Sequence, residues 1–284
     1  ILMGLAFAVM WSSAFTSARI IVMDASPLLA LSLRYLISGL IGVGIALALG
    51  QSWRLTPAQW RATIIFGVLQ NAVYLGLNFI AMQTIEASLA AIIASTMPLL
   101  VGFAAWAFLG EKLRPLGIAG LFAGVIGVAI IMGARLGGQV DLYGLILCAI
   151  GVVALTAATL LVRGATSGGN FLMVVGLQML VGCVALSIAT LLFETPRIDP
   201  SLRLTLAFAY TCLVPGLAAT VVWFWLVNRI GATRAATFHF LNPFFGVAIA
   251  ALLLGETLGP RDILGVAIIA GGILAVQISR QRKR

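Results

Sequence analysis

Two stretches of the chain follow the same pattern: ASLAAIIASTMPLLVGFAAWAFLGE at residues 87–111 and ATRAATFHFLNPFFGVAIAALLLGE at residues 232–256. They align without gaps at an offset of 145 residues, and the match continues beyond them. Prolines and glycines that coincide at one constant offset predict an internal repeat rather than a chance resemblance between apolar helices. The pairs that this offset superposes are Pro98 with Pro243, Gly110-Glu111 with Gly255-Glu256, Pro115 with Pro260, Gly120 with Gly265, and Gly127 with Gly272.

Composition places this repeat in a membrane. Of the 284 residues, 62% are hydrophobic and 9% are charged, which leaves too few polar residues for the surface of a soluble protein. The apolar core of a bilayer, about 30 Å thick, requires about 20 apolar residues per helix. Polar residues and helix-starting prolines divide the chain into segments of about that length. The ten predicted spans are residues 1–22, 28–50, 59–82, 87–109, 115–134, 142–163, 170–193, 201–228, 233–254 and 261–279.

Equivalent positions of the repeat are five spans apart. Because five is odd, the two repeats must cross the membrane in opposite directions, as in many secondary transporters. The sequence therefore predicts an all-α polytopic membrane protein built from two inverted five-helix repeats, residues 1–136 and 137–284, with a tail at 280–284. Two conformations of similar energy, one open to each side, follow from such symmetry. This favours movement of a small-molecule substrate by alternating access.

The net charge of +9 does not indicate a nucleic-acid partner, because the basic residues stand singly at predicted helix ends and in the tail. Eleven of them fall on one set of alternate connections and five on the other. Basic residues are retained in the cytoplasm, so both termini are expected there. The eleven are Arg54, Arg61, Lys112, Arg114, Arg163, Arg229, Arg234, Arg280, Arg282, Lys283 and Arg284, and the five are Arg19, Arg135, Arg197, Arg203 and Arg261.

The motifs resemble those of a known family. Pro27 is followed by Leu33-Arg34-Tyr35, and residues 87–127 and 232–272 each carry spaced alanines, a proline, Gly-Glu and spaced glycines. This pattern resembles the drug/metabolite transporter superfamily, more narrowly its ten-helix EamA-type exporters, and within them the YddG-like aromatic amino acid exporters. The resemblance covers essentially the whole chain. It implies a bacterial inner-membrane protein that exports amino acids, aromatic and other neutral ones, or similar metabolites.

Two arginines, Arg34 and Arg163, are candidates for a charged gate or a substrate anchor. Arg34 stands seven residues past Pro27, roughly 10 Å along its helix. An arginine inside a membrane must face water or bind carbonyl groups. Arg34 therefore anchors a substrate carboxylate, closes a gate, or snorkels to the interface and ties helix ends together, and the sequence leaves these alternatives open.

Prolines interrupt three predicted spans, at Pro98, Pro215 and Pro243. Each removes a backbone donor and frees the carbonyl four residues earlier. Kinks at the equivalent positions Pro98 and Pro243 predict hinged helices around a site near the midplane. The alternative is a fixed kink that only shapes packing.

Polar side chains inside the predicted spans must face a partner helix or a cavity. Asn71, Tyr74 and Asn78 fall on one face of a helix. A cavity lined by aromatic and neutral polar groups would suit amphipathic substrates, and its rings could also hold an organic cation. The predicted substrate-binding residues are Trp11, Asn71, Tyr74, Asn78, Ser95, Thr96, Gln178, Tyr210, Trp223, His239, Asn242 and Phe244.

His239 is the only histidine, and Asn242 follows one turn later. The imidazole either contacts substrate, carries a proton, or is a satisfied hydrogen-bonding group. All eight carboxylates, Glu111 and Glu256 among them, lie at or near span ends, where those two are expected to cap or brace helices. Proton and cation pumps usually keep a carboxylate inside the membrane. Its absence here favours facilitated transport.

The sequence contains neither HExxH nor GxSxG and has no carboxylate pair inside a span, so we expect no enzyme, no cofactor and no metal site. A multidrug or organic-cation exporter of the same superfamily is the alternative function. We expect a small-molecule substrate, a lipid bilayer as surroundings, and a monomer, with a dimer as the second possibility. Because the chain begins inside an apolar run at Ile1, we also expect residues to precede it.

Overall fold

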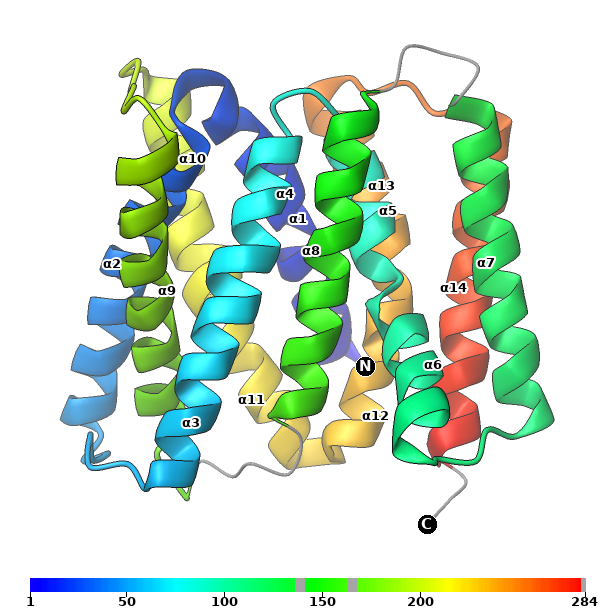
Figure 1. Cartoon of the computed structure of the whole chain (residues 1–284), viewed down its shortest axis with the longest axis horizontal. Helices are drawn as coiled ribbons and strands as arrows, with labels where there is room; N and C mark the ends of the chain where they lie inside the picture. Colours follow the sequence, from blue (N-terminus) through cyan, green and yellow to red (C-terminus); the bar gives the residue numbers. More distant parts are fainter. Residues whose placement is uncertain (136–140, 163–167, 282–284) are drawn as a thin grey trace. The chain divides into compact units, whose positions relative to one another are not determined.

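The computed structural model describes residues 1–135, 141–162 and 168–281, and these residues form an all-helical protein (Figure 1). Within the described residues, ten helical segments are long and apolar enough to span a membrane. Their bounds are Leu2–Asp24, Pro27–Ala48, Pro57–Ala81, Ala87–Leu109, Pro115–Gly133, Leu142–Leu161, Phe171–Phe193, Leu202–Ile230, Arg234–Leu254 and Pro260–Arg280. The predicted fold class of ten transmembrane helices is confirmed.

Several of these spans are broken into shorter helices. The elements in chain order are α1 (Leu2–Asp24), α2 (Pro27–Ala48), α3 (Pro57–Phe66), η1 (Gly67–Tyr74), α4 (Leu75–Ala81), α5 (Ala87–Ser95), α6 (Met97–Leu109), α7 (Pro115–Arg135), α8 (Leu142–Leu161), α9 (Phe171–Phe193), α10 (Leu202–Thr211), η2 (Cys212–Ala218), α11 (Ala219–Ile230), α12 (Ala232–Thr237), η3 (Phe238–Leu241), α13 (Asn242–Leu254) and α14 (Pro260–Gln281). Of the η segments, η1 and η2 are π-helical and η3 is a 3₁₀ turn.

Helix starts follow local chemistry that the sequence displays. Thr56 caps α3 in a capping box: its hydroxyl accepts from the Gln59 amide at 3.3 Å, and the Gln59 side chain accepts from the Thr56 amide at 2.9 Å. Prolines begin α2, α3, α7 and α14, where a missing N–H costs nothing. The eighth span begins at Leu202, one residue after its predicted start at residue 201, because Ser201 caps it through the Leu204 amide.

The chain forms two compact units. Unit 1 comprises residues 1–16, 84–146 and 218–284, and unit 2 comprises residues 17–83 and 147–217. Each unit therefore takes helices from both of the repeats predicted from the sequence.

In unit 1, α7 and α14 lie side by side (Figure 1), and glycines line their contact. A Cβ placed on Gly120 would lie 2.7 Å from the carbonyl oxygen of Gly272, and a Cβ on Gly127 would lie 2.8 Å from that of Gly265. Gly265 and Gly272 stand 145 residues after Gly120 and Gly127. The first glycine of α7 therefore meets the second of α14, and the second of α7 meets the first of α14. Such crossed contacts between equivalent positions are those that a two-fold axis produces.

In unit 2, α2 and α9 show the same pattern at an offset of 144 residues. Gly39 and Gly176 approach closely, since a Cβ on either would lie 3.1 Å from the carbonyl oxygen of the other. At the matching positions, the Oγ of Ser32 lies 3.8 Å from the Sγ of Cys183. Small residues at both crossings allow the helix backbones to come together in a membrane, where packing drives association.

Two kinds of irregular backbone, the π-helical segments and the left-handed glycines, also recur at the offset of the internal repeat. The π-helical segments η1 and η2 begin 145 residues apart, at Gly67 and Cys212. The glycines that end α6 and α13 are left-handed, with φ of 66° at Gly110 and 69° at Gly255. A side chain with a Cβ would be strained at both positions, which explains why glycine occupies them.

Candidate functional site

A group of aromatic and polar side chains in unit 1 surrounds His239. The imidazole centroid lies 5.3 Å from the ring of Phe7, 6.3 Å from that of Trp11 and 5.2 Å from that of Trp223. Phe7 and Trp223 also contact each other, with centroids 4.7 Å apart. The rings come from α1, α11 and η3, so three separate segments build this cluster, which we call the His239 cluster.

Asn242 joins the cluster by a hydrogen bond to the imidazole. Its Nδ2 lies 2.9 Å from His239 Nδ1. An amide nitrogen only donates, so Nδ1 accepts and the other ring nitrogen, Nε2, carries the hydrogen. The Oδ1 of Asn242 is buried without a hydrogen-bond partner among the described residues. The cluster therefore presents aromatic faces, one imidazole donor and one unsatisfied amide acceptor.

The break in the ninth span positions these groups. Pro243 has no N–H and stands in the first turn of α13, so the helix is interrupted by the 3₁₀ turn η3 that carries His239. The hydroxyl of Ser12, in α1, donates to the backbone carbonyl of Asn242 at 3.2 Å. This bond satisfies a carbonyl next to the break and ties α1 to the start of α13.

Other predicted residues of unit 1 lie outside this cluster. Ser95 and Thr96 donate back to carbonyls of their own helix, Ala91 and Ile93, each at 2.6 Å. Pro98 is buried in the first turn of α6, next to the break that matches the one at Pro243. Phe244 is 40% exposed.

The two glutamates at helix ends, Glu111 and Glu256, contact other helices. Glu256 accepts from the backbone amides of Ala87 and Ser88 at 2.7 and 3.0 Å, and so caps α5. Glu111 forms an ion pair with Arg280 at 3.2 Å. A carboxylate at a helix N-terminus satisfies free amides and is favoured by the helix dipole.

In unit 2 the predicted polar stripe forms hydrogen bonds between helices. Asn71 accepts from the Tyr35 hydroxyl at 3.3 Å and donates to the carbonyl of Gln178 at 2.9 Å. Asn78 donates to the carbonyl of Tyr74 at 2.8 Å and accepts from Cys148 at 3.4 Å. Asn71, Tyr74 and Asn78 are all buried, and η1 makes the span π-helical between the first two.

The remaining predicted residues of unit 2 differ in surroundings. Tyr210 is 39% exposed, near the end of α10. Pro215 lies within the π-helical segment η2 and is buried. Arg34 is 6% exposed, with its guanidinium 5.3 Å from the ring of Tyr35. Arg163 lies outside the described residues.

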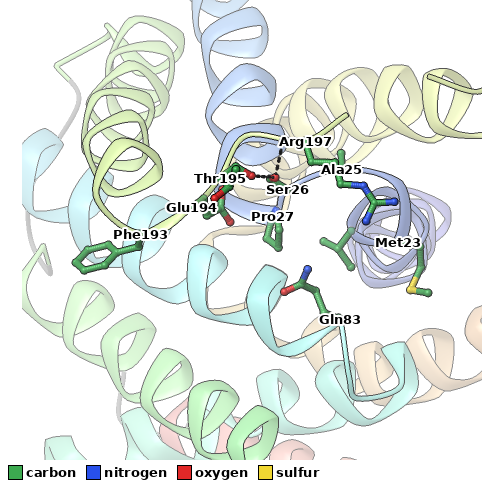
Figure 2. Close-up of a pocket in the computed structure, with 10 residues that line it drawn as sticks. Met23, Ala25, Ser26, Pro27, Gln83, Phe193, Glu194, Thr195 and Arg197 are labelled. Atoms are coloured by element: carbon green, nitrogen blue, oxygen red, sulfur yellow. Dashed lines mark hydrogen bonds between the residues drawn. The ribbon is translucent and has the colours of Figure 1, made fainter. Parts of the chain in front are cut away.

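A cavity that sequence reasoning missed lies at the end of unit 2 where α1 meets α2. It has a volume of about 310 Å³, and Figure 2 shows Gln83, Glu194 and Arg197 among its lining residues. Glu194 caps α2 by accepting from the amides of Leu28 and Leu29 at 2.9 and 3.0 Å. Ser26-Pro27 was a visible signal of a helix start here, but the capping carboxylate comes from a distant segment.

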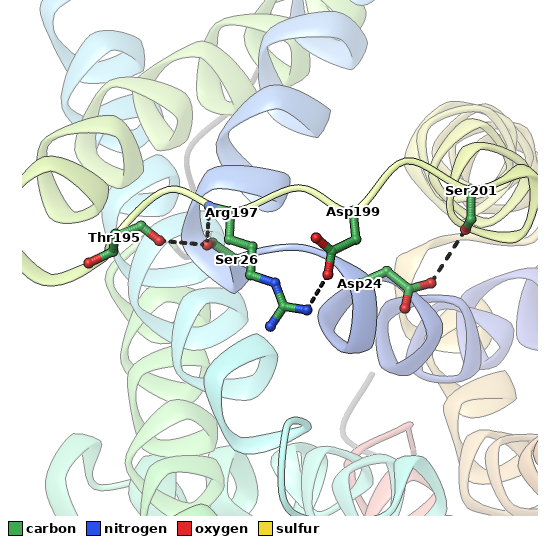
Figure 3. Close-up of polar contacts among 6 residues, drawn as sticks. All are labelled: Asp24, Ser26, Thr195, Arg197, Asp199 and Ser201. Atoms are coloured by element: carbon green, nitrogen blue, oxygen red, sulfur yellow. Dashed lines mark hydrogen bonds and ion pairs between the residues drawn. The ribbon is translucent and has the colours of Figure 1, made fainter.

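The segment after α9 runs along this cavity and is held by polar contacts (Figure 3). The amide of Ser26 donates to the carbonyl of Arg197, and the amide of Arg197 donates to the hydroxyl of Ser26, both at 2.8 Å. Arg197 also pairs with Asp199, which lowers the pKa of that carboxyl and raises the pKa of the guanidinium. These contacts hold the N-terminal end of α2 in place.

Comparison with known proteins identifies the class of the molecule. The EamA-like transporter family matches residues 1–133 and again residues 142–278. The chain belongs to this family. It is a transporter rather than an enzyme, as its named relatives are. The family places the fold described above among multi-pass membrane proteins.

Relatives of this EamA-family chain carry transporter names. It is 27% identical to the uncharacterized transporter YvbV of Bacillus subtilis, over 97% of this chain and 90% of the relative. It is 30% identical to the aromatic amino acid exporter YddG of Ancylobacter novellus, but over 39% of each chain. One solved crystal structure matches it with a TM-score of 0.71 and 22% identity, covering 100% of this chain and 98% of the other, which shows the fold.

Proposed function

We propose that this EamA-family transporter exports amino acids, aromatic and other neutral ones, by alternating access and without proton coupling. The observation that carries the proposal is the His239 cluster, in which three aromatic rings surround an imidazole donor and an unsatisfied amide acceptor. A planar apolar side chain can pack against such rings, and an α-amino group can donate to an amide oxygen. The partial match to an aromatic amino acid exporter supports this substrate class.

Alternating access draws support from the recurring features of the two halves. The crossed glycine contacts of α7 with α14, and the matching contacts of α2 with α9, are those expected if residues 1–136 and 137–284 are inverted repeats. In that arrangement the two repeats exchange conformations when the transporter turns from one side to the other. The excess of basic residues on one set of connections supports cytoplasmic termini in a bacterial inner membrane.

Export of organic cations is the second candidate. Aromatic faces attract a cation by their quadrupole, and Phe7, Trp11 and Trp223 all lie near His239. The two candidates differ in what the substrate must carry besides its ammonium group. An amino acid also brings a carboxylate, whereas a quaternary amine does not.

The experiment is counterflow in proteoliposomes. Purified protein is reconstituted with unlabelled amino acid inside, and uptake of radiolabelled phenylalanine, tryptophan, methionine and threonine is measured with and without an imposed pH gradient. We expect uptake of the aromatic substrates that is unchanged by the gradient.

Two results would contradict the proposal. Gradient-driven accumulation would assign proton coupling to the protein. Uptake of a labelled quaternary amine in place of any amino acid would favour the organic-cation function. Protein-free liposomes serve as the negative control.

A further inference from the structure

Arg34 is a buried cation of unit 2 for which the described residues show no ion pair. It is 6% exposed, and its Nε has no hydrogen-bond partner among the described residues. Two described carboxylates pair with other arginines, Asp199 with Arg197 and Glu111 with Arg280. A charge buried in a membrane protein without a partner is costly, so its retention points to a partner that arrives from outside the chain.

The matching position of the other half holds a neutral residue. Gln178 stands 144 residues after Arg34, at the offset by which α2 and α9 make their paired contacts. Gln178 takes part through its backbone, where its carbonyl accepts from the side chain of Asn71 in η1 at 2.9 Å. The side-chain amide of Asn71 thus links η1 to α9.

The residue of η2 that corresponds to Asn71 has no side-chain amide. Gly216 stands 145 residues after Asn71, and a Cβ placed on it would lie 3.8 Å from Nη2 of Arg34. Next to it, the hydroxyl of Ser38 donates to the carbonyl of Cys212 at 3.3 Å. The contact between α2 and η2 therefore differs from the matching contact between α9 and η1 at two positions. It has Gly216 in place of the hydrogen-bonding Asn71, and it has the guanidinium of Arg34 in place of the neutral side chain of Gln178.

We infer that Arg34 binds the carboxylate of the transported substrate at a site of its own in unit 2, between α2 and η2, in a binding step distinct from contact with the His239 cluster of unit 1. A guanidinium offers planar, paired N–H donors that match the two oxygens of a carboxylate, and Tyr35 supplies a ring beside it. The inference rests on the proposed function and deepens it, because it makes a carboxylate a required part of the substrate. Neutral amides and plain amines of the same shape would then be poor substrates.

The structure of η2 gives the carboxylate a way in. The segment Cys212–Ala218 is π-helical and contains Pro215, so it lacks the regular hydrogen bonds that hold an α-helix rigid. A shift of this one segment would uncover Arg34 without unfolding α2. The neighbouring α10 and α11 would remain helical on either side of it.

The test compares phenylalanine with phenylalaninamide, which keeps the ring and the ammonium group but has no carboxylate. Each is used as an unlabelled competitor of phenylalanine counterflow by the wild-type protein. Loss of a charge-assisted hydrogen-bond pair should weaken the amide by roughly tenfold to hundredfold. In Arg34→Gln and Arg34→Lys the ratio between the two competitors should fall toward one.

A binding measurement keeps the two proposals distinguishable. Thermal unfolding of the detergent-solubilised protein is followed with 3-phenylpropionate and with 3-phenylpropionamide, and we expect stabilisation by the acid alone, lost in Arg34→Gln. Stabilisation by the acid without any amino acid flux would contradict the proposed function but support the carboxylate site.

The matched control is Arg203→Gln, the same substitution at an exposed arginine near the start of α10. It should leave competitor ratios and ligand stabilisation unchanged. If Arg34→Gln does not fold, the test relies on Arg34→Lys and on the comparison of phenylalanine with phenylalaninamide in the wild type. Equal competition by phenylalanine and its amide in the wild type, or an unchanged ratio in a folded Arg34 variant, would overturn the inference.

Discussion

A Cβ atom placed on Gly272 would lie 2.6 Å from the carbonyl oxygen of Gly120, whereas one placed on the preceding Gly271 would meet nothing within 4 Å. The two glycines are neighbours in α14, yet they face different surroundings. Gly272 is where the backbones of α7 and α14 touch, and Gly271 points away from that contact. Substitutions at the two positions separate helix propensity from helix packing.

We expect Gly272→Ala to destabilise unit 1 and Gly271→Ala to be neutral or slightly stabilising. Alanine gains about 0.5–1 kcal/mol over glycine in a helix interior. At Gly272 this gain is outweighed because the added methyl group would push two helix backbones apart. Thermal unfolding in detergent measures both variants. Equal stability of the two would show that this helix contact tolerates a side chain.

Replacement of Asn242 by alanine should reduce amino acid flux by roughly tenfold, since a hydrogen bond to a buried polar group is worth about 1–1.5 kcal/mol. The change removes the unsatisfied Oδ1 and leaves His239 Nδ1 without its donor. Thr237→Ala is the control, because Thr237 bonds only locally, to the Arg234 carbonyl at 2.6 Å. Full counterflow in folded Asn242→Ala protein would remove Asn242 from the site.

Replacement of Glu256 by glutamine should destabilise the protein by about 1–2 kcal/mol through loss of the cap on α5. One carboxylate oxygen would become an NH₂ group facing the amide of Ala87 or Ser88, so that two donors would oppose each other. Glu194→Gln should have a similar cost, because Glu194 caps α2 in the same way. Chemical or thermal unfolding of the reconstituted protein measures both costs.

Asp24→Asn is the comparison for these two variants. The Asp24 carboxylate accepts one long surface contact, at 3.5 Å from Ser201, which an asparagine oxygen can retain. We expect its stability to match that of the wild type. A loss as large as that of Glu256→Gln would mean that charge, rather than the cap, determines the effect.

Acid should weaken the connection before α8, where Asp141 accepts from the Thr84 hydroxyl at 2.5 Å. This bond, with smaller contributions from the amides of Gly144 and Tyr143, lowers the pKa of the Asp141 carboxyl below its ordinary value of 3.8, against partial desolvation that raises it. A lowered pKa means stability that is present above the ordinary value and is lost as pH falls through the folded value.

Unfolding measured from pH 7 down to about pH 3 should therefore show a loss of stability below about pH 4 in the wild type. Asp141→Asn and Thr84→Val should each flatten this part of the profile. Thr205→Val is the control, because the Thr205 hydroxyl bonds within its own helix, to the carbonyl of Ser201. The same steep profile in Asp141→Asn would assign the acid sensitivity to another group.

The sequence by itself determined the number and type of the helices. A bilayer leaves backbone groups no partner except those within the same helix, so apolar segments of sufficient length must be helical, and Pro27, Thr56-Pro57 and Pro260 mark starts by local chemistry alone. The breaks at Pro98 and Pro243 also follow from one residue each. These predictions needed no knowledge of which helix lies beside which.

Only the tertiary structure decided how the polar and aromatic residues are grouped. Trp11 and Trp223 join His239, while Phe244, on the same helix as Asn242, is exposed. Phe7 escaped prediction because a phenylalanine within an apolar run looks like any residue facing lipid. The caps by Glu194 and Glu256 likewise join segments far apart in the chain. Helical periodicity fixes which residues share a face, but which partner that face meets depends on packing between helices, which no single segment encodes.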